Sequence, residues 1–176
     1  MSATPGPAGE SVESAAASPG TVAARPSVLL LHGPNLNLLG ERDPAQYGRT
    51  TLADIEARVT ELGAELGVDV ACHQSNHEGV LVDHVHAARR LHQGIVLNPG
   101  AHAHYSIALR DAIEAVSIPC VEIHISNVHA REPFRHTSVT APVTRGYISG
   151  CGVFGYDLAL RAVLHRMAEG AEGAQD

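Results

Sequence analysis

The stretch EIHIS, residues 122–126, alternates polar and apolar side chains as a β-strand with one polar face does. Glu122, His124 and Ser126 are the polar members, so their side chains are expected to share that face. A carboxylate two residues from a histidine can bond one ring nitrogen and leave the other aimed at a substrate. The pattern predicts a His124 ring that is held by Glu122 and aimed at a substrate, with a purely structural Glu–His pair as the alternative.

Two arginines follow this strand in the segment HAREPFR, at positions 131 and 135. Arginine presents a planar fork of N–H donors that suits oxygen-rich anions. Arg131 and Arg135 therefore favour a site for a small anion over a merely structural Glu–His pair.

A second source of chemistry is the segment HGPNLNLLGERDPAQYG, residues 32–48, which contains Arg42 and Tyr47. A tyrosine ordinarily titrates at about pH 10, but a nearby guanidinium favours the phenolate and makes it a usable base. The glycines, prolines and asparagines predict a loop, and a closing loop would bring both residues over a substrate and expel water. Spacing alone leaves open a surface tyrosine packed on the loop.

The glycines of GCGVFG, at positions 150, 152 and 155, match part of a dinucleotide-binding fingerprint. That fingerprint requires a further strand and an acidic residue about 20 positions on, and the sequence after Gly155 offers no further strand. We favour close packing of a helix against a sheet as the role of these glycines.

The chain has 12 histidines, which raises the possibility of a metal site. His84 and His86 lie two apart on a predicted helix and therefore point to different sides. His102 and His104 lie on a loop and could bind one ion together, but no motif of metal-ligand spacing supports them. We expect solvated or hydrogen-bonded imidazoles, and neither a metal nor another cofactor.

The elements that must position these residues are short apolar runs alternating with helical segments. Four helical stretches are expected to separate five strands, and a further helix to close the chain. Thr51 with Asp54 resembles a capping box, and Ser106 opens another helix. The predicted strands are 28–32, 68–73, 94–98, 119–126 and 146–149. The predicted helices are 51–67, 79–92, 106–116 and 153–169, and the helical stretch between the last two strands has no assigned bounds.

This alternation predicts an α/β fold with a doubly wound parallel sheet. Ligands bind such sheets beyond the carboxyl ends of the strands. The first four strands end in HGPNLN, HQSNHEG, NPGAHAH and HISNVHAR, so the unusual residues collect at that edge. This coincidence is the strongest argument for an active site that rests on the residues alone.

Composition excludes several classes of protein. The 176 residues are 44% hydrophobic and 18% charged, the balance of a globular chain. A net charge of −7 argues against nucleic-acid binding through phosphates, and no apolar run approaches the roughly 20 residues that span a bilayer. Without a C-x-x-C pair, Cys72, Cys120 and Cys151 are expected to be buried, reduced thiols in a soluble cytoplasmic protein.

The two ends differ from the rest in composition. Residues 1–26 are rich in Ala, Ser, Pro and Gly and lack the pattern of a secretory signal, so we expect a disordered leader. Residues 170–176 are expected to form a similar tail. The catalytic domain is then 27–169.

The stretches GPNLNLLGERDPAQYG, QSNHEG, LNPGAHAHYSIALRDAI and EIHISNVHAREPFRHTS resemble those of the type II 3-dehydroquinate dehydratases, in order, over about residues 27–168. The resemblance implies a flavodoxin-like five-stranded parallel sheet with helices on both faces. It implies reversible dehydration of 3-dehydroquinate through an enolate, in the shikimate pathway or in quinate breakdown, without a cofactor. It also implies a homo-dodecamer, a tetramer of trimers.

Carried over by position, the resemblance also implies roles for individual residues. The catalytic set comprises the base Tyr47, its partner Arg42, the general acid His124, the orienting Glu122, and Asn35, which holds a water at the enolate. The substrate-binding set comprises Asn98, Ser126 and the backbone of Ile125 for the carboxylate, His104 and Arg135 for the ring hydroxyls, and Asp111 from a neighbouring subunit. Arg131 is implied to help set the potential near Tyr47.

Three positions depart from the commonest family pattern: His32 stands where asparagine is usual, and His102 and Tyr105 where tyrosine and threonine are usual. None matches a catalytic residue, so the reaction stays as implied. The alternative from another class is a flavodoxin-like binding module without chemistry, which requires the Tyr, Arg and His matches to be accidental.

Overall fold

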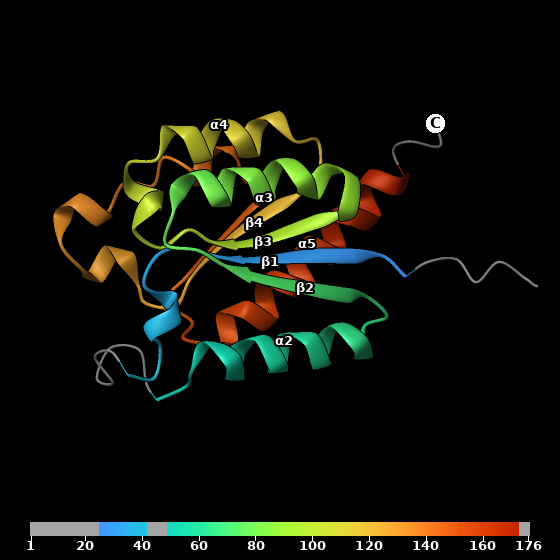
Figure 1. Ribbon diagram of the computed structural model, residues 1–176, viewed down its shortest axis with the longest axis horizontal. Coiled ribbons are helices and arrows are strands. Elements are labelled where there is room, and N and C mark those ends of the chain that lie inside the picture. The colour runs from blue at the N-terminus through green and yellow to red at the C-terminus, as the bar shows by residue number, and fades with distance from the viewer. Residues whose placement is uncertain (1–24, 42–48, 173–176) are drawn as a thin grey trace, which may run out of the picture.

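Five parallel strands form the centre of the structure (Figure 1). The computed structural model describes residues 25–41 and 49–172 of the chain. The strand order β2-β1-β3-β4-β5 is that of a flavodoxin-like doubly wound sheet, which confirms the predicted fold. The strands are β1 (Ser27–His32), β2 (Asp69–Gln74), β3 (Gly94–Asn98), β4 (Cys120–His124) and β5 (Gly146–Ser149).

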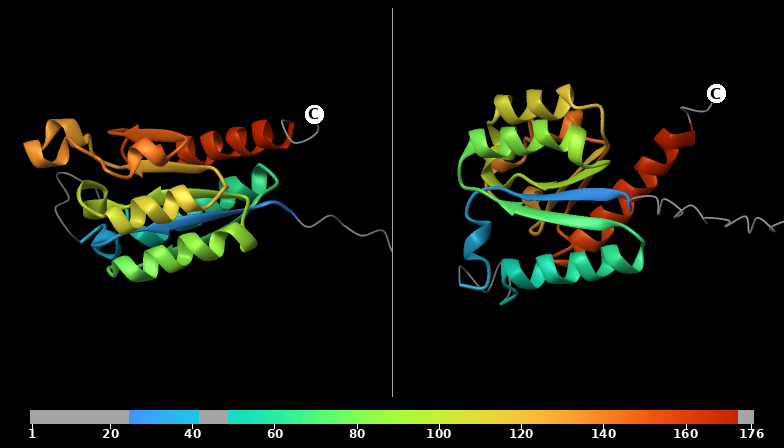
Figure 2. Two further views of the ribbon diagram at one scale, coloured as in Figure 1. Left: turned by 90° about the horizontal axis from the view of Figure 1, so that it is seen from above. Right: turned by 45° about the vertical axis from the view of Figure 1, so that its right-hand side comes forward.

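Helices cover both faces of this sheet (Figures 1 and 2). On one face lie α2 (Leu52–Glu65) and α5 (Phe154–Glu172), and on the other lie α3 (Glu78–Leu91) and α4 (Ile107–Ala115). Each layer encloses its own apolar core, because successive strand residues point to opposite faces. In β1, Val28 and Leu30 pack toward α2 and α5, whereas Leu29 and Leu31 pack toward α3 and α4.

Two helices begin where the sequence predicts. The Thr51 hydroxyl accepts a hydrogen bond from the Asp54 amide while the Asp54 carboxylate accepts one from the Thr51 amide, which completes the capping box of α2. The Ser106 hydroxyl accepts from the amide of Leu109 at the start of α4. Both caps satisfy amides that have no partner within the helix.

The connection from β4 to β5 differs from the prediction of a fourth helical stretch. It contains three short 3₁₀ helices, η3 (Val128–Ala130), η4 (Pro133–Arg135) and η5 (Ala141–Val143). Pro133 and Pro142 interrupt the segment, and proline lacks the N–H that an α-helix interior needs. β4 also ends at His124 rather than at residue 126, because the chain bends there.

The boundaries of the predicted domain also shift. α5 continues to Glu172, past the end predicted at 169. At the other end, the Pro26 carbonyl accepts a hydrogen bond from the Asp69 amide at the start of β2, so this residue already belongs to the fold. The remainder of the predicted leader and tail lies outside the described residues, as does the segment 42–48.

The last glycine of GCGVFG brings α5 close to the sheet. A Cβ at Gly155 would lie 2.5 Å from Cδ1 of Ile123 in β4. No strand follows α5 within the described ranges. The helix–sheet packing expected for these glycines is therefore present at Gly155. A Cβ at Gly152 would meet nothing within 4 Å, and one at Gly150 would meet Asn127, which lies after β4.

Across residues 25–41 and 49–172, we find no helix with the length and apolar character needed to cross a membrane.

Gly33, directly after β1, is a site where a side chain has no room. A Cβ there would lie 2.3 Å from the Pro99 carbonyl oxygen, and the Gly33 amide donates to the Asn98 carbonyl at 2.7 Å. Because both contacts are with backbone, we expect Gly33→Ala to destabilise the protein by about 1–3 kcal/mol, measured by denaturant unfolding. The control is Gly79→Ala in α3, where a Cβ meets nothing within 4 Å; it should be neutral or stabilise by up to about 1 kcal/mol. Equal effects of the two changes would refute this account.

Candidate active site

A cleft of about 150 Å³ opens at the carboxyl ends of β1, β3 and β4. In Figure 1 this edge of the sheet lies at the left, where the short 3₁₀ segments gather. The cleft is at the edge that the sequence predicts for ligand binding. Eight of the residues singled out from the sequence line it: Asn35, Asn98, His104, His124, Ile125, Ser126, Arg131 and Arg135.

His124 is held at the wall of the cleft by Glu122. Its Nε2 donates to Glu122 Oε1 at 2.8 Å, which confirms the hydrogen bond expected from the EIHIS pattern. The Glu122 side chain is completely buried and that of His124 is 7% exposed. With Nε2 bonded to the carboxylate, Nδ1 is the ring nitrogen left for a ligand, as an acceptor in neutral imidazole or a donor in imidazolium.

Two hydroxyl groups that the sequence analysis missed complete the surroundings of Glu122. Ser138 Oγ donates to Glu122 Oε1 at 3.0 Å, and Thr140 Oγ1 donates to Oε2 at 2.6 Å. The carboxylate thus accepts three hydrogen bonds, which is what a buried ion requires. Ser138 and Thr140 lie 16 and 18 residues after Glu122, so no local spacing signals their role.

Rings on two sides restrict the orientation of His124. The ring of His104 is nearly parallel to it, with centroids 6.4 Å apart, and the ring of Tyr147 lies at 5.5 Å. His104 Nδ1 donates to the Thr137 carbonyl at 2.9 Å, because a carbonyl can only accept. Neutral His104 therefore carries its proton on Nδ1 and offers Nε2 as an acceptor.

Two asparagines lie on the opposite side of the cleft. Asn35 has φ of 65°, and it is the one non-glycine residue with positive φ in the described ranges. Asparagine tolerates this left-handed conformation better than most residues do. Asn98 ends β3 with 3% of its surface exposed, and its Oδ1 accepts from the Gly100 amide at 3.2 Å.

The two arginines share one carboxylate. Glu132 Oε2 lies 2.8 Å from Arg135 Nε and 3.5 Å from Arg131 Nε. Hydrogen bonds to its own backbone amide and to Arg135 lower the pKa of Glu132 below its ordinary value. Both guanidinium groups also line the cleft, where they suit an oxygen-rich anion.

Two of the described residues singled out from the sequence, Glu122 and Asp111, are not among those that line the cleft. Asp111 is exposed on α4. Arg42 and Tyr47 lie outside the described residues.

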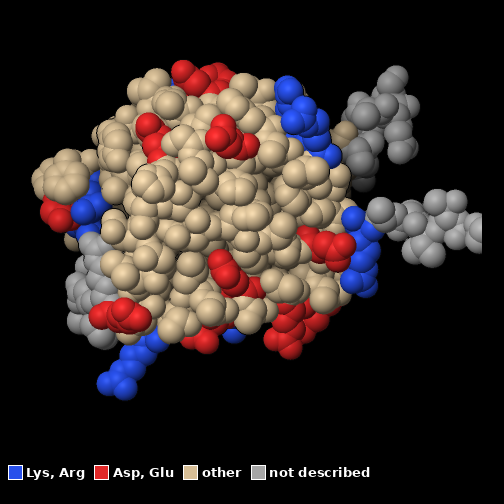
Figure 3. Space-filling view, in the orientation of Figure 1, with Lys and Arg blue, Asp and Glu red and all other residues tan. Residues whose placement is uncertain are grey.

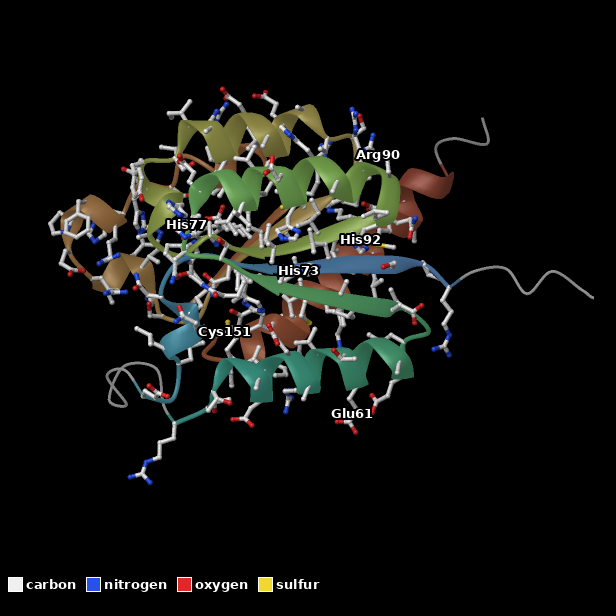
Figure 4. The ribbon with its side chains drawn as sticks, viewed as in Figure 1. Glu61, His73, His77, Arg90, His92 and Cys151 are labelled. Atoms are coloured by element: carbon white, nitrogen blue, oxygen red, sulfur yellow. The ribbon has the colours of Figure 1, made fainter. Side chains whose placement is uncertain are left out.

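Among the described residues, no group of three or more His, Cys, Asp or Glu side chains is arranged to hold a metal ion. His102 Nδ1 is hydrogen-bonded to the Tyr105 hydroxyl at 2.8 Å, which joins two of the positions that depart from the family pattern. Figure 4 shows His73, His77 and His92 spaced along the sheet rather than gathered at one point.

Comparison with known proteins agrees with this fold and identifies the family. The family model described as Dehydroquinase class II matches residues 26–164. The 3-dehydroquinate dehydratase of Anoxybacillus flavithermus is 58% identical over 142 residues, covering 81% of this chain and 95% of that protein.

Two solved structures share the fold. The type II dehydroquinase from Butyrivibrio crossotus is 44% identical, with a TM-score of 0.78 over 80% of this chain and 98% of that one. That from Propionibacterium acnes is 46% identical, with a TM-score of 0.75 over 77% of this chain and 93% of that one.

The flavodoxin-like sheet and the histidine at its carboxyl edge are those of an α/β enzyme. The chain belongs to the class II dehydroquinase family.

Thr140 tests the support of the buried carboxylate. Thr140→Val keeps the shape but removes the 2.6 Å hydrogen bond to Glu122. A hydrogen bond to a charged group contributes about 1.5–3 kcal/mol, so we expect turnover to fall by about tenfold or more as Glu122 loses its orientation. Thr144→Val is the control, because the Thr144 hydroxyl donates to the Ala141 carbonyl and not to Glu122. If steady-state turnover is equal in both variants, the hydrogen bond from Thr140 to Glu122 does not contribute to catalysis.

Proposed function

We propose that this chain is a lyase that catalyses the reversible trans-dehydration of 3-dehydroquinate to 3-dehydroshikimate through an enolate. The observation that carries the proposal is the Glu122–His124 pair at the wall of the cleft, in a member of this family. The same reaction serves the shikimate pathway and quinate breakdown.

The first step removes a proton from C2 of the substrate. Tyr47 as phenolate accepts this proton, and the guanidinium of Arg42 stabilises the phenolate. The electron pair of the broken C–H bond becomes the enolate, and Asn35, which lines the cleft, holds a water at the enolate oxygen. Arg131 contributes positive potential near Tyr47.

The second step expels the C1 hydroxyl. His124 as imidazolium gives its Nδ1 proton to the departing oxygen, and water leaves as the enolate collapses to the enone. Glu122 holds Nε2–H throughout and balances the imidazolium charge. Proton exchange with solvent then restores Tyr47 and His124.

Substrate is held by groups around the cleft. Asn98, Ser126 and the backbone of Ile125 bind the carboxylate, and His104 and Arg135 contact the ring hydroxyls. The guanidinium groups of Arg131 and Arg135 complement the negative charge of the substrate. Both steps are proton transfers, and the proposal includes no cofactor.

We further propose a homo-oligomer, a dodecamer built as a tetramer of trimers, in which Asp111 reaches the site of a neighbouring subunit. Asp111 is exposed and lies away from the cleft of its own chain. Exposed apolar side chains of α3, of α4 and of the residue directly before Ser106 also favour association: Val80, Leu91, Tyr105 and Ile107. The middle of the face drawn in Figure 3 carries few charged side chains.

A cytoplasmic location completes the proposal. Cys72, Cys120 and Cys151 are free thiols in the structure, which suits a reducing compartment. The expectation that all three are buried is wrong, because Cys72 is partly exposed and Cys151 is exposed.

The activity is tested with purified protein and 3-dehydroquinate, in the presence of a chelator, by the ultraviolet absorbance of the conjugated enone. We expect turnover in the native chain and a loss of about 100- to 10,000-fold in Tyr47→Phe, because the proton acceptor is removed. KM should change much less, and Arg42→Lys should retain part of the turnover that Arg42→Ala loses. If the native chain forms no enone, a binding module without chemistry is favoured instead. Near-normal turnover in Tyr47→Phe would show that Tyr47 is not the base.

The shared site is tested by co-expressing Asp111→Ala with Tyr47→Phe. Each variant alone should be impaired. In mixed oligomers, a site is complete where its own subunit retains Tyr47 and the neighbouring subunit retains Asp111. With equal amounts of the two variants, we expect this for about a quarter of the sites. Activity no higher than that of the separate variants would show that Asp111 does not act across a subunit boundary.

A further inference from the structure

His32 is a buried histidine that the proposed mechanism does not use. It is the last residue of β1, pairs in register with Asn98 at the end of β3, and has no exposed surface. Residues in register on neighbouring parallel strands point to the same face. His32 and Asn98 therefore both face the layer of α2 and α5, where Tyr156 of α5 lies between them.

The hydrogen bonds around Tyr156 have one consistent direction. The Gly100 amide donates to Asn98 Oδ1, so Asn98 Nδ2 is the atom facing Tyr156 and donates to its hydroxyl oxygen at 2.8 Å. The Tyr156 hydroxyl proton then has His32 Nδ1 as its acceptor, at 3.3 Å. One N–H of Asn98 Nδ2 is left for the cleft that this residue lines.

His32 is in the right protonation state to accept. Burial lowers its pKa to about 4, so the imidazole is neutral at pH 7. Because Nδ1 accepts, the ring proton sits on Nε2, which lies 3.7 Å from Oε1 of Glu56 on α2. That distance is too long for a hydrogen bond, and Nε2 has no such partner in the described ranges.

We propose that His32 is a positioning residue for substrate binding: it accepts the Tyr156 hydroxyl proton and thereby keeps Asn98 with an N–H donor directed to the cleft. The inference rests on the proposed contact between Asn98 and the substrate carboxylate. His32 itself does not touch the substrate.

The reason is that the Tyr156 side chain has no exposed surface, so its hydroxyl proton needs an acceptor within the protein. Without His32, the nearest alternative is Asn98 Oδ1, which requires the amide to turn over. A turned amide would direct Nδ2 at the Gly100 amide, so two donors would face each other. The loss of His32 therefore leaves either a buried unpaired hydroxyl or a misoriented Asn98, and both are unfavourable.

The experiment compares KM and turnover in four variants. His32→Leu should raise KM for 3-dehydroquinate by about tenfold and change turnover by less than about threefold, because a binding donor rather than the acid or base is misplaced. His32→Asn, whose amide oxygen can accept the Tyr156 proton, should restore KM. Tyr156→Phe should raise KM, and adding His32→Leu to it should cause no further rise.

Two controls separate the possible failures. Leu30→Val changes the packing of the same face of β1 two residues earlier, at an equally buried position, and should leave KM unchanged. Asn98→Ala should raise KM at least as much as His32→Leu does.

An unchanged KM in Asn98→Ala would show that the proposed substrate contact is wrong. A raised KM in Asn98→Ala with an unchanged KM in His32→Leu would overturn the role of His32 alone. Multiplying effects in the His32→Leu/Tyr156→Phe double variant would also overturn it. If His32→Leu does not fold, the KM values of His32→Asn and Tyr156→Phe are compared instead. The proposal predicts a raised KM in Tyr156→Phe and a KM close to that of the native chain in His32→Asn. A KM about tenfold above the native value in His32→Asn would overturn the proposal.

Discussion

The buried carboxylate of Glu122 is the constraint on which the site depends. A charge without solvent exposure is tolerable only where hydrogen bonds replace water. The hydroxyls of Ser138 and Thr140 and the ring of His124 supply them. The irregular link between β4 and β5 therefore has to return to β4, and the same link carries the two arginines that line the cleft.

Each layer of the fold contributes one polar network to the site. The Glu122 network lies on the α3–α4 side of the sheet, and the network of His32, Tyr156 and Asn98 lies on the α2–α5 side. The two networks meet at the carboxyl edge, where His124 and Asn98 line one cleft. The apolar cores keep the strands in register, and this register fixes the separation of the two networks.

The sequence predicted the sheet and the Glu122–His124 contact because both rest on local patterns: alternation along a strand, and apolar runs bounded by caps. It missed the contacts of Thr140 and Tyr156 because these join residues that only the fold brings together, up to 124 positions apart. It also predicted an α-helix where prolines produce 3₁₀ turns. The roles of Arg42 and Tyr47 rest on motif resemblance alone.

The carboxylate shared by Arg131 and Arg135 also affects how an anion reaches the cleft. Glu132 is an internal counter-ion, so the pair projects a weaker field into solvent than two guanidinium groups alone would. The chain as a whole is acidic and repels anions at long range. Attraction is therefore confined to about one Debye length from the cleft, and association gains little from electrostatic steering. Low ionic strength therefore does not speed the encounter with an anionic ligand, because the repulsion by the acidic chain then extends further into solvent.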